Sequence, residues 1–148
     1  MPIKLNLQTA ALRICVDRYE QEHIEGRILS QRLCAPMSFR DAGDLVILLD
    51  QLMDIQRHPE AFQRVRSFSA HPRMRNIPAA LEPEEMLPPE LVSAEEGRRL
   101  TFRLHVTSRM NSSWQGRIDW LDGSPEQHFD STLDFLRELE ARLSSTPD

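Results

Sequence analysis

The sequence has little cysteine and little glycine, and it has no long apolar run. Its two cysteines, Cys15 and Cys34, are too few for a disulfide scaffold and fit a reducing compartment. Its five glycines include no phosphate-cradling Gly-x-Gly-x-x-Gly or Gly-x-x-x-x-Gly-Lys spacing. No run reaches the roughly 18 apolar residues of a membrane helix, and the first residues lack the apolar stretch of a signal peptide. We therefore expect a cytoplasmic protein without a membrane segment.

No motif for catalysis or metal binding occurs in the chain. Its five histidines and two cysteines form none of the His-x3-His, His-Glu-x-x-His or Cys-x-x-Cys spacings that hold zinc. None of its serines lies in the Gly-x-Ser-x-Gly turn that exposes a catalytic nucleophile. We therefore expect no metal, no cofactor and no catalytic residue, and we predict that the protein is not an enzyme.

The composition is that of an ordinary globular chain. Apolar residues make up 40% and charged residues 28%, so the chain can bury a core. A length of 148 residues fits one ordinary domain or two small ones. The formal net charge of −5 disfavours non-specific attraction to nucleic acid or to an anionic membrane.

The chain contains a weak internal repeat with an offset of 90 residues. Residues 12–49 align with residues 102–139 without a gap, and eight of the 38 pairs are identical. The clearest segment is Trp114-Gln-Gly-Arg-Ile-Asp-Trp120, whose plainer copy is Ile24-Glu-Gly-Arg-Ile-Leu-Ser30. Internal repeats decide the fold of a chain, so they take precedence over other patterns. We therefore predict two similar modules, over residues 9–55 and 101–143.

Each module begins with two predicted strands. Apolar and polar residues alternate with a period of two, which is typical of a half-buried strand. Gly26 and Gly116 occupy the same place in the second strand, which indicates a bulge or a close backbone approach. A turn and a short third strand follow, and this strand ends at Phe39 in the first module and Phe129 in the second.

A helix completes each module. Asp41 and Ser131 are natural N-caps. Asp44 and Asp134 stand three residues later, close to the arrangement of a capping box. The sequence therefore predicts an α+β fold of two tandem β-β-β-α modules related by pseudo-twofold symmetry. An antiparallel sheet would carry the helices on one face.

The first of these helices is apolar almost all round, whereas the second has a single apolar stripe. Such a helix needs burial on more than one side, so it lies centrally or meets another subunit. We therefore expect the protein to bind itself as a homodimer, and the candidate interface residues are Ile47, Leu48 and Leu52.

Residues 56–100 are predicted to link the modules. The linker would open with a short helix at His58-Pro59-Glu60 and continue as a proline-rich extended segment. Its first half is basic and its second half acidic. The alternatives are a solvated linker and a docking strap whose halves meet surfaces of opposite charge. Residues 144–148 are predicted to form a disordered tail.

The sheet face opposite the helices is the candidate binding surface. Strand parity directs four arginines and one histidine to it, namely Arg13, Arg27, Arg103, Arg117 and His105. If the apolar residues of both strands lie on the same face of an antiparallel hairpin, Asp17 is predicted to lie opposite Arg27 and to form an ion pair with it. Arginines on one sheet face can bind a phosphate backbone or an acidic peptide, and the alternative is a solvated face laced with salt bridges.

The two tryptophans, Trp114 and Trp120, fall on the inward parity and are predicted to anchor the core. The alternative is a partner-binding pocket or an interface hot spot. With these tryptophans directed inward, the arginine face lacks the exposed stacking aromatics that single-stranded nucleic acids favour.

The second module carries Phe102-x-Leu-x-Val106, Trp114-x-Gly116-x-Ile118 and Phe129-x-Ser131. In these motifs, and in the tandem arrangement, residues 10–143 resemble clostridial proteins of the Firmicutes that contain two "WxG" modules. That family has no assigned activity. The resemblance therefore implies a fold and no functional residue.

Three functions follow as hypotheses. The first is a non-enzymatic protein-interaction or regulatory module with an unknown protein partner, because catalytic motifs are missing and apolar surface is in excess. The second is binding of nucleic acid or an acidic ligand on the arginine face, in which nucleic acid is not favoured. The third is an enzyme with a site assembled between the modules.

Overall fold

A computed structural model of the protein describes residues 3–21, 23–59 and 76–145. Its elements are β1 (Leu12–Glu20), β2 (His23–Leu29), β3 (Met37–Phe39), α1 (Ala42–Gln56), the single-turn 3-10 helix η1 (Pro83–Glu85), α2 (Pro89–Ala94), β4 (Leu100–Ser108), β5 (Gln115–Asp119), β6 (Gln127–Phe129) and α3 (Thr132–Ser145). The strands form one six-stranded antiparallel sheet in the order β3-β2-β1-β4-β5-β6. The predicted α+β class and antiparallel sheet are therefore confirmed.

The two halves of the sheet meet at β1 and β4. These central strands pair antiparallel, with Leu12 opposite Leu104 and Ile14 opposite Phe102. The pairing places β3 and β6, of three residues each, at the outer edges. Short edge strands are a common way to limit strand addition by other chains. The edge-to-edge joining also places the outward-facing residues of both halves on one continuous surface.

A β-bulge shifts the register in both long hairpins. The β1–β2 pairing shifts between Val16 and Arg18, and the β4–β5 pairing shifts between Val106 and Ser108. The prediction that Asp17 lies opposite Arg27 is therefore wrong, because Cys15 is the residue opposite Arg27. The predicted ion pair nevertheless forms, with 3.0 Å between Arg27 Nε and Asp17 Oδ2.

The glycines of the second strands lie where the backbone of the neighbouring strand approaches closely. A Cβ atom on Gly26 would lie 2.0 Å from the carbonyl oxygen of Cys15, and one on Gly116 would lie 2.0 Å from that of His105. In each case the phenylalanine opposite in the third strand, Phe39 or Phe129, places its ring over the glycine. The close backbone approach predicted from the glycines is thus confirmed.

Both long helices start as their sequences predict. The backbone N–H of Asp44 donates to Asp41 Oδ1 at 2.7 Å, and that of Asp134 donates to Ser131 Oγ at 2.9 Å. The return bond of a full capping box would go to the N-cap residue. In α1 the Asp44 carboxylate accepts from the backbone N–H of Arg40, the residue that precedes the N-cap.

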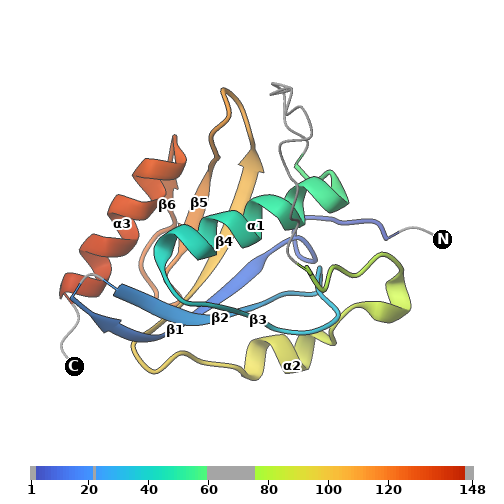
Figure 1. Ribbon diagram of the computed structural model, residues 1–148, viewed down its shortest axis with the longest axis horizontal. Coiled ribbons are helices and arrows are strands. Elements are labelled where there is room, and N and C mark those ends of the chain that lie inside the picture. The colour runs from blue at the N-terminus through green and yellow to red at the C-terminus, as the bar shows by residue number, and fades with distance from the viewer. Residues whose placement is uncertain (1–2, 22, 60–75, 146–148) are drawn as a thin grey trace.

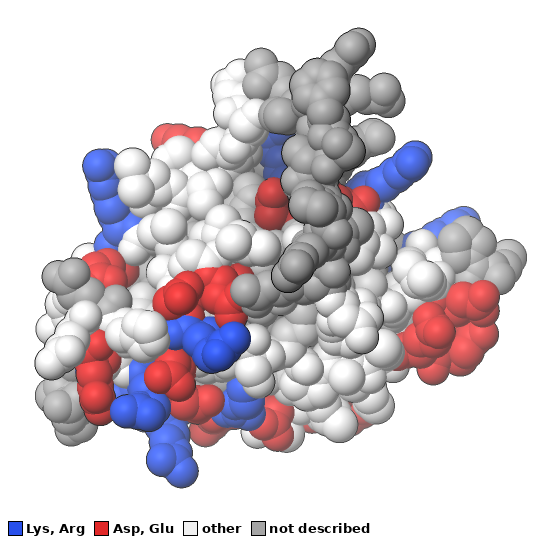
Figure 2. Space-filling model, viewed as in Figure 1, with Lys and Arg blue, Asp and Glu red and all other residues white. Residues whose placement is uncertain are grey.

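The core lies between the sheet and the helices α1 and α3 (Figure 1). α1 buries Leu45, Leu49 and Met53 against the sheet. α3 buries Phe135, whose ring centroid lies 5.9 Å from that of Trp114. Figure 2 shows this side of the molecule, where charges of both signs are interspersed around α3 and acidic side chains gather over η1. α1 and α3 thus both contribute to the core on this side of the sheet.

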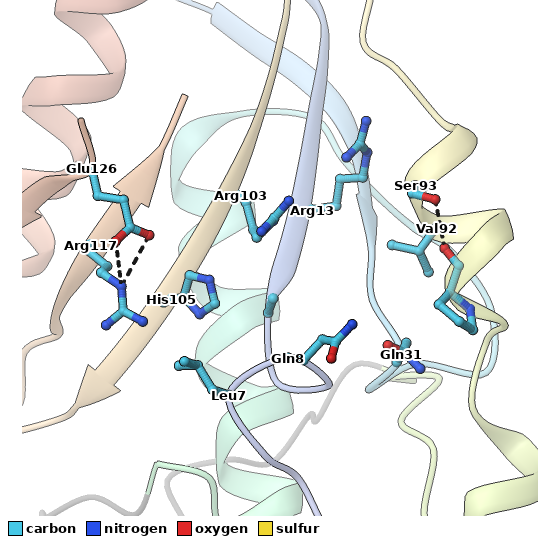
Figure 3. A pocket seen from close by; sticks show the side chains of 12 residues that line it. Leu7, Gln8, Arg13, Gln31, Val92, Ser93, Arg103, His105, Arg117 and Glu126 are labelled. Atoms are coloured by element: carbon cyan, nitrogen blue, oxygen red, sulfur yellow. Dashed lines mark hydrogen bonds and ion pairs between the residues drawn. The ribbon is translucent and has the colours of Figure 1, made fainter. Parts of the chain in front are cut away.

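The helix before β4 has a different position from α1 and α3. This helix, α2, lies toward the opposite face of the sheet (Figure 3). The linker thus contains η1 and α2, neither of which the sequence pattern indicated. The short helix predicted from His58 falls mostly outside the described residues. α3 continues to Ser145, two residues into the predicted tail, and residues 146–148 lie outside the described range. Every helix within the described ranges is too short or too polar to span a bilayer.

Candidate functional site

The outer face of the sheet holds an open pocket of about 640 Å³ (Figure 3). Its floor comes from β1, β4 and β5, and α2 and the segment before β1 contribute to its sides. Twelve residues line it: Leu7, Gln8, Ala11, Arg13, Gln31, Pro89, Val92, Ser93, Arg103, His105, Arg117 and Glu126. The structure thus brings together four of the five residues predicted for the binding face, and we call this site the arginine pocket.

Two arginines face each other at the centre of the sheet. Arg13 of β1 lies directly opposite Arg103 of β4 in the strand register. Nε of Arg13 donates to the backbone carbonyl of Glu95 at 2.7 Å. Among the residues that the structure describes, the Arg103 guanidinium has no hydrogen-bond or ion-pair partner. Figure 3 shows its side chain reaching from β4 toward β1. Like charges in directly opposed positions are unfavourable, so this pair favours a bound anion.

His105 and Arg117 form the second polar group of the pocket and lie opposite each other on β4 and β5. Nε of Arg117 lies 3.2 Å from the carboxylate of Glu126. His105 is 9% exposed. Its burial lowers its pKa, and the charges of Arg117 and Arg103 lower it further, against the opposing effect of Glu126. His105 is therefore mainly neutral at pH 7, and the positive charge of the pocket comes from its arginines.

Arg27, the fifth predicted residue, lies on the same sheet face and outside the pocket lining. Residues 95–99 of the linker, which we call the crossing segment, run over this part of the sheet: Glu95 and Glu96 contact Arg27, and the backbone N–H of Arg99 donates to Val16. Arg27 forms ion pairs with Asp17 and with the carboxylate of Glu95. Glu95, in the acidic half of the linker, therefore meets a positive part of the sheet, as the docking-strap alternative predicts for that half. Most of the basic half lies outside the described residues. Cys15 lies beneath the crossing segment and is fully buried, and this burial raises the pKa of its thiol.

Sequence patterns did not indicate the walls of the pocket. Leu7 and Gln8 come from the segment before β1, and Val92 and Ser93 come from α2. Gln31 follows β2. The apolar contribution of Leu7 and Val92 beside several arginines makes the site amphipathic. The one available signal was the charge contrast between the acidic half of the linker and the arginine face.

The three candidate interface residues of α1 differ in exposure. Leu48 is 5% exposed and Leu52 fully buried, and both pack in the core of the chain itself. Ile47 is 48% exposed. α1 is apolar almost all round because residues on most of its turns face the sheet or the surrounding core. Of the three residues, Ile47 is the one available for contact with another molecule.

Within the described ranges, no three His, Cys, Asp or Glu side chains come together as a metal site requires. The charged groups of the arginine pocket are mainly cations, which suit anions and not metal ions. Comparisons with family models, with curated proteins and with solved structures each give no significant match to this chain. The resemblance to clostridial two-module proteins therefore stays a prediction.

Proposed function

We propose that the protein is a non-enzymatic interaction module that binds an anionic ligand in the arginine pocket. The observation that supports this most directly is the Arg13–Arg103 pair. Two guanidiniums project from opposed positions, and that of Arg103 lacks a partner among the described residues. A bound carboxylate or phosphate would relieve the repulsion and supply charge-assisted hydrogen bonds, which are stronger than neutral ones.

The composition of the pocket supports binding rather than catalysis. Arginine side chains stay protonated at neutral pH, so they bind charge and do not exchange protons with a substrate. Glu126 is held in its ion pair with Arg117. His105 is the remaining lining residue that titrates near neutrality, and general acid–base chemistry usually needs such a group to be oriented by a second one.

The surroundings of the pocket favour a short ligand over a nucleic acid. The net charge of the chain is −5, so a long polyanion is repelled beyond the pocket. Trp114 and Trp120, which could stack on bases, are 3% and 4% exposed and belong to the core. A volume of about 640 Å³ lies within the range of roughly 300–1,000 Å³ typical of small-ligand pockets.

The test uses inorganic pyrophosphate and citrate as probes. Each is titrated into the protein at low salt, and NMR follows the Arg Nε–Hε signals together with the ring of His105. We expect saturable shifts at Arg103. We also expect the pKa of His105 to rise on binding, because an added anion offsets the arginines that lower it. Binding should weaken as salt is added.

The pocket variant is Arg103→Glu with Arg117→Glu. Its control, Arg18→Glu with Arg40→Glu, makes the same change in net charge at exposed positions outside the pocket. The pocket variant should lose binding of both probes, and the control should retain it. Undetectable binding of both probes to the wild-type protein at low salt would refute the proposed function.

We further propose that the two β-β-β-α units form a repeated module with pseudo-twofold symmetry. Matching bulges, matching glycine contacts and equivalent helix caps support this. A crystal structure in which segments 12–53 and 102–143 superpose poorly would contradict it. The homodimer and the cytoplasmic location also stay predictions. Light scattering of the wild type and of Ile47→Glu tests the homodimer, because Ile47 is its exposed candidate residue.

A further inference from the structure

The chain itself shows how an acidic segment binds to this sheet face. In the crossing segment, the carboxylate of Glu95 pairs with Arg27. The backbone carbonyl of the same residue accepts from Arg13 Nε at 2.7 Å. Beside it, the backbone N–H of Arg98 donates to Asp17 Oδ1 at 3.2 Å. One glutamate thus engages two arginines on neighbouring strands, one through its side chain and one through its backbone.

The second half of the sheet repeats the arginines of this arrangement. Arg103 and Arg117 stand 90 residues after Arg13 and Arg27. The cross-strand pairing is the same in both hairpins, since Cys15 lies opposite Arg27 and His105 lies opposite Arg117. The difference is that the second pair faces the open pocket and not a covering acidic segment.

Arg117 can accept a second carboxylate without losing its first. In the first half, Arg27 holds Asp17 and Glu95 at once. In the second half, Arg117 holds Glu126, whose side chain is 45% exposed. Thr107, which corresponds to Asp17, is uncharged. One carboxylate position on Arg117 is therefore taken, and a second corresponds to the position that Glu95 takes on Arg27.

We propose that the arginine pocket binds an extended, glutamate-containing peptide segment of a partner protein, an inference that rests on the proposed anion-binding function. The glutamate carboxylate pairs with Arg117, and its backbone carbonyl accepts from Arg103, as Glu95 does with Arg27 and Arg13. The apolar side chains of Leu7 and Val92 contact the residues on either side of the glutamate.

A peptide fits these features better than a nucleic acid does. The template consists of one carboxylate and one carbonyl within a single residue, which a peptide provides and a phosphate backbone does not. Recognition through a backbone carbonyl also uses a hydrogen bond that every peptide can accept. The apolar contributions of Leu7 and Val92 suit side chains better than phosphates.

The probe is a fluorescein-labelled synthetic peptide with the sequence of residues 92–98, Val-Ser-Ala-Glu-Glu-Gly-Arg. Fluorescence anisotropy measures its binding to the full chain at low salt. Its matched control peptide carries glutamine in place of both glutamates. We expect binding to weaken by about tenfold or more with the glutamine peptide, because each lost charge-assisted contact reduces affinity by about that factor.

Protein variants then locate the contact. Arg103→Glu with Arg117→Glu should abolish binding, whereas Arg18→Glu with Arg40→Glu should bind within about twofold of wild type. Arg117→Glu should bind a peptide with lysines in place of both glutamates better than it binds the original peptide. Circular dichroism verifies the fold of each variant, and Arg103→Gln replaces the double variant should that one unfold.

The outcomes separate this inference from the proposed function. Equal binding of the glutamate and glutamine peptides overturns the inference. So does an absence of peptide binding while citrate and pyrophosphate bind, which leaves the proposed function standing. Tighter binding of a twelve-base oligothymidylate than of the peptide would overturn it in favour of nucleic acid. Failure of the peptide and of both small anions removes the inference and the proposed function together.

Discussion

Alanine at Gly26 or Gly116 should destabilise the protein strongly, and by similar amounts. A Cβ atom at either position would lie 2.0 Å from a carbonyl oxygen of the neighbouring strand. Contacts of a real Cβ essentially never fall below 3.0 Å, so the strands must separate by at least 1.0 Å. The rings of Phe39 and Phe129 hinder movement the other way, because they lie 2.9 and 3.0 Å from the same Cβ positions.

The magnitude follows from the two consequences of this separation. Overpacking of a well-packed site costs about 1–3 kcal/mol. A shift of this size also stretches ladder hydrogen bonds beyond their normal range, and the loss of two such bonds, at about 1 kcal/mol each, adds about 2 kcal/mol. We therefore expect each substitution to lower the free energy of unfolding by about 3–5 kcal/mol. A typical domain has about 5–15 kcal/mol in total, so the effect is large.

Urea denaturation, followed by the fluorescence of the buried Trp114 and Trp120, measures the change. The control is Gly43→Ala in the first turn of α1, where the nearest atom to a new Cβ is Asp41 Oδ1 at 3.4 Å. This change should lie within about 1 kcal/mol of wild type, on the stabilising side, because alanine favours a helix more than glycine does. A decrease of less than about 1 kcal/mol in the free energy of unfolding for Gly26→Ala or Gly116→Ala would refute the close approach of the strands at these glycines.

Three further predictions concern the caps, a bridge between the halves and the effect of pH. Asp41→Ala and Ser131→Ala should each cost about 1 kcal/mol in urea denaturation, because each removes a hydrogen bond to the third residue of a helix; no change would show that these bonds contribute nothing. Arg109, which follows β4, has a side chain that is 6% exposed and forms an ion pair with Asp54 of α1 at 2.7 Å. Arg109→Ala should therefore lower the free energy of unfolding by about 2–4 kcal/mol, whereas the control Arg18→Ala, at an exposed position, should lower it by less than about 1 kcal/mol. The pKa of His105 is lower in the folded chain than its usual value of 6.5; its contribution to stability is therefore present above pH 6.5 and is lost as the pH falls through the folded pKa. Thermal melts at pH 7.5 and 5.5 should show this loss, His105→Gln should reduce it, and an unchanged pH dependence in that variant would contradict the assignment.

The local sequence determined the strands, the helices α1 and α3, and the directions of their side chains. Alternation in Leu12, Ile14 and Val16 placed these side chains in the core and Arg13 on the outer face, since a strand directs neighbouring residues to opposite sides. Asp41 and Ser131 fixed the helix starts because a cap acts within a few residues. The glycines indicated close strand approach because that too depends on immediate neighbours.

Only the tertiary structure decided what the outer face became. Parity treated Arg13, Arg27, Arg103 and Arg117 alike, but the crossing segment covers Arg27 and leaves Arg103 exposed. This difference arises from contacts such as that between Arg27 and Glu95, 68 residues apart, which no local pattern encodes. The burial of Leu48 and Leu52 was likewise decided by the tertiary structure. Because α1 is apolar almost all round, its sequence alone could not show whether the chain's own core or a partner buries them. Local periodicity fixes which side a residue faces, and only the packing of distant segments determines what it meets there.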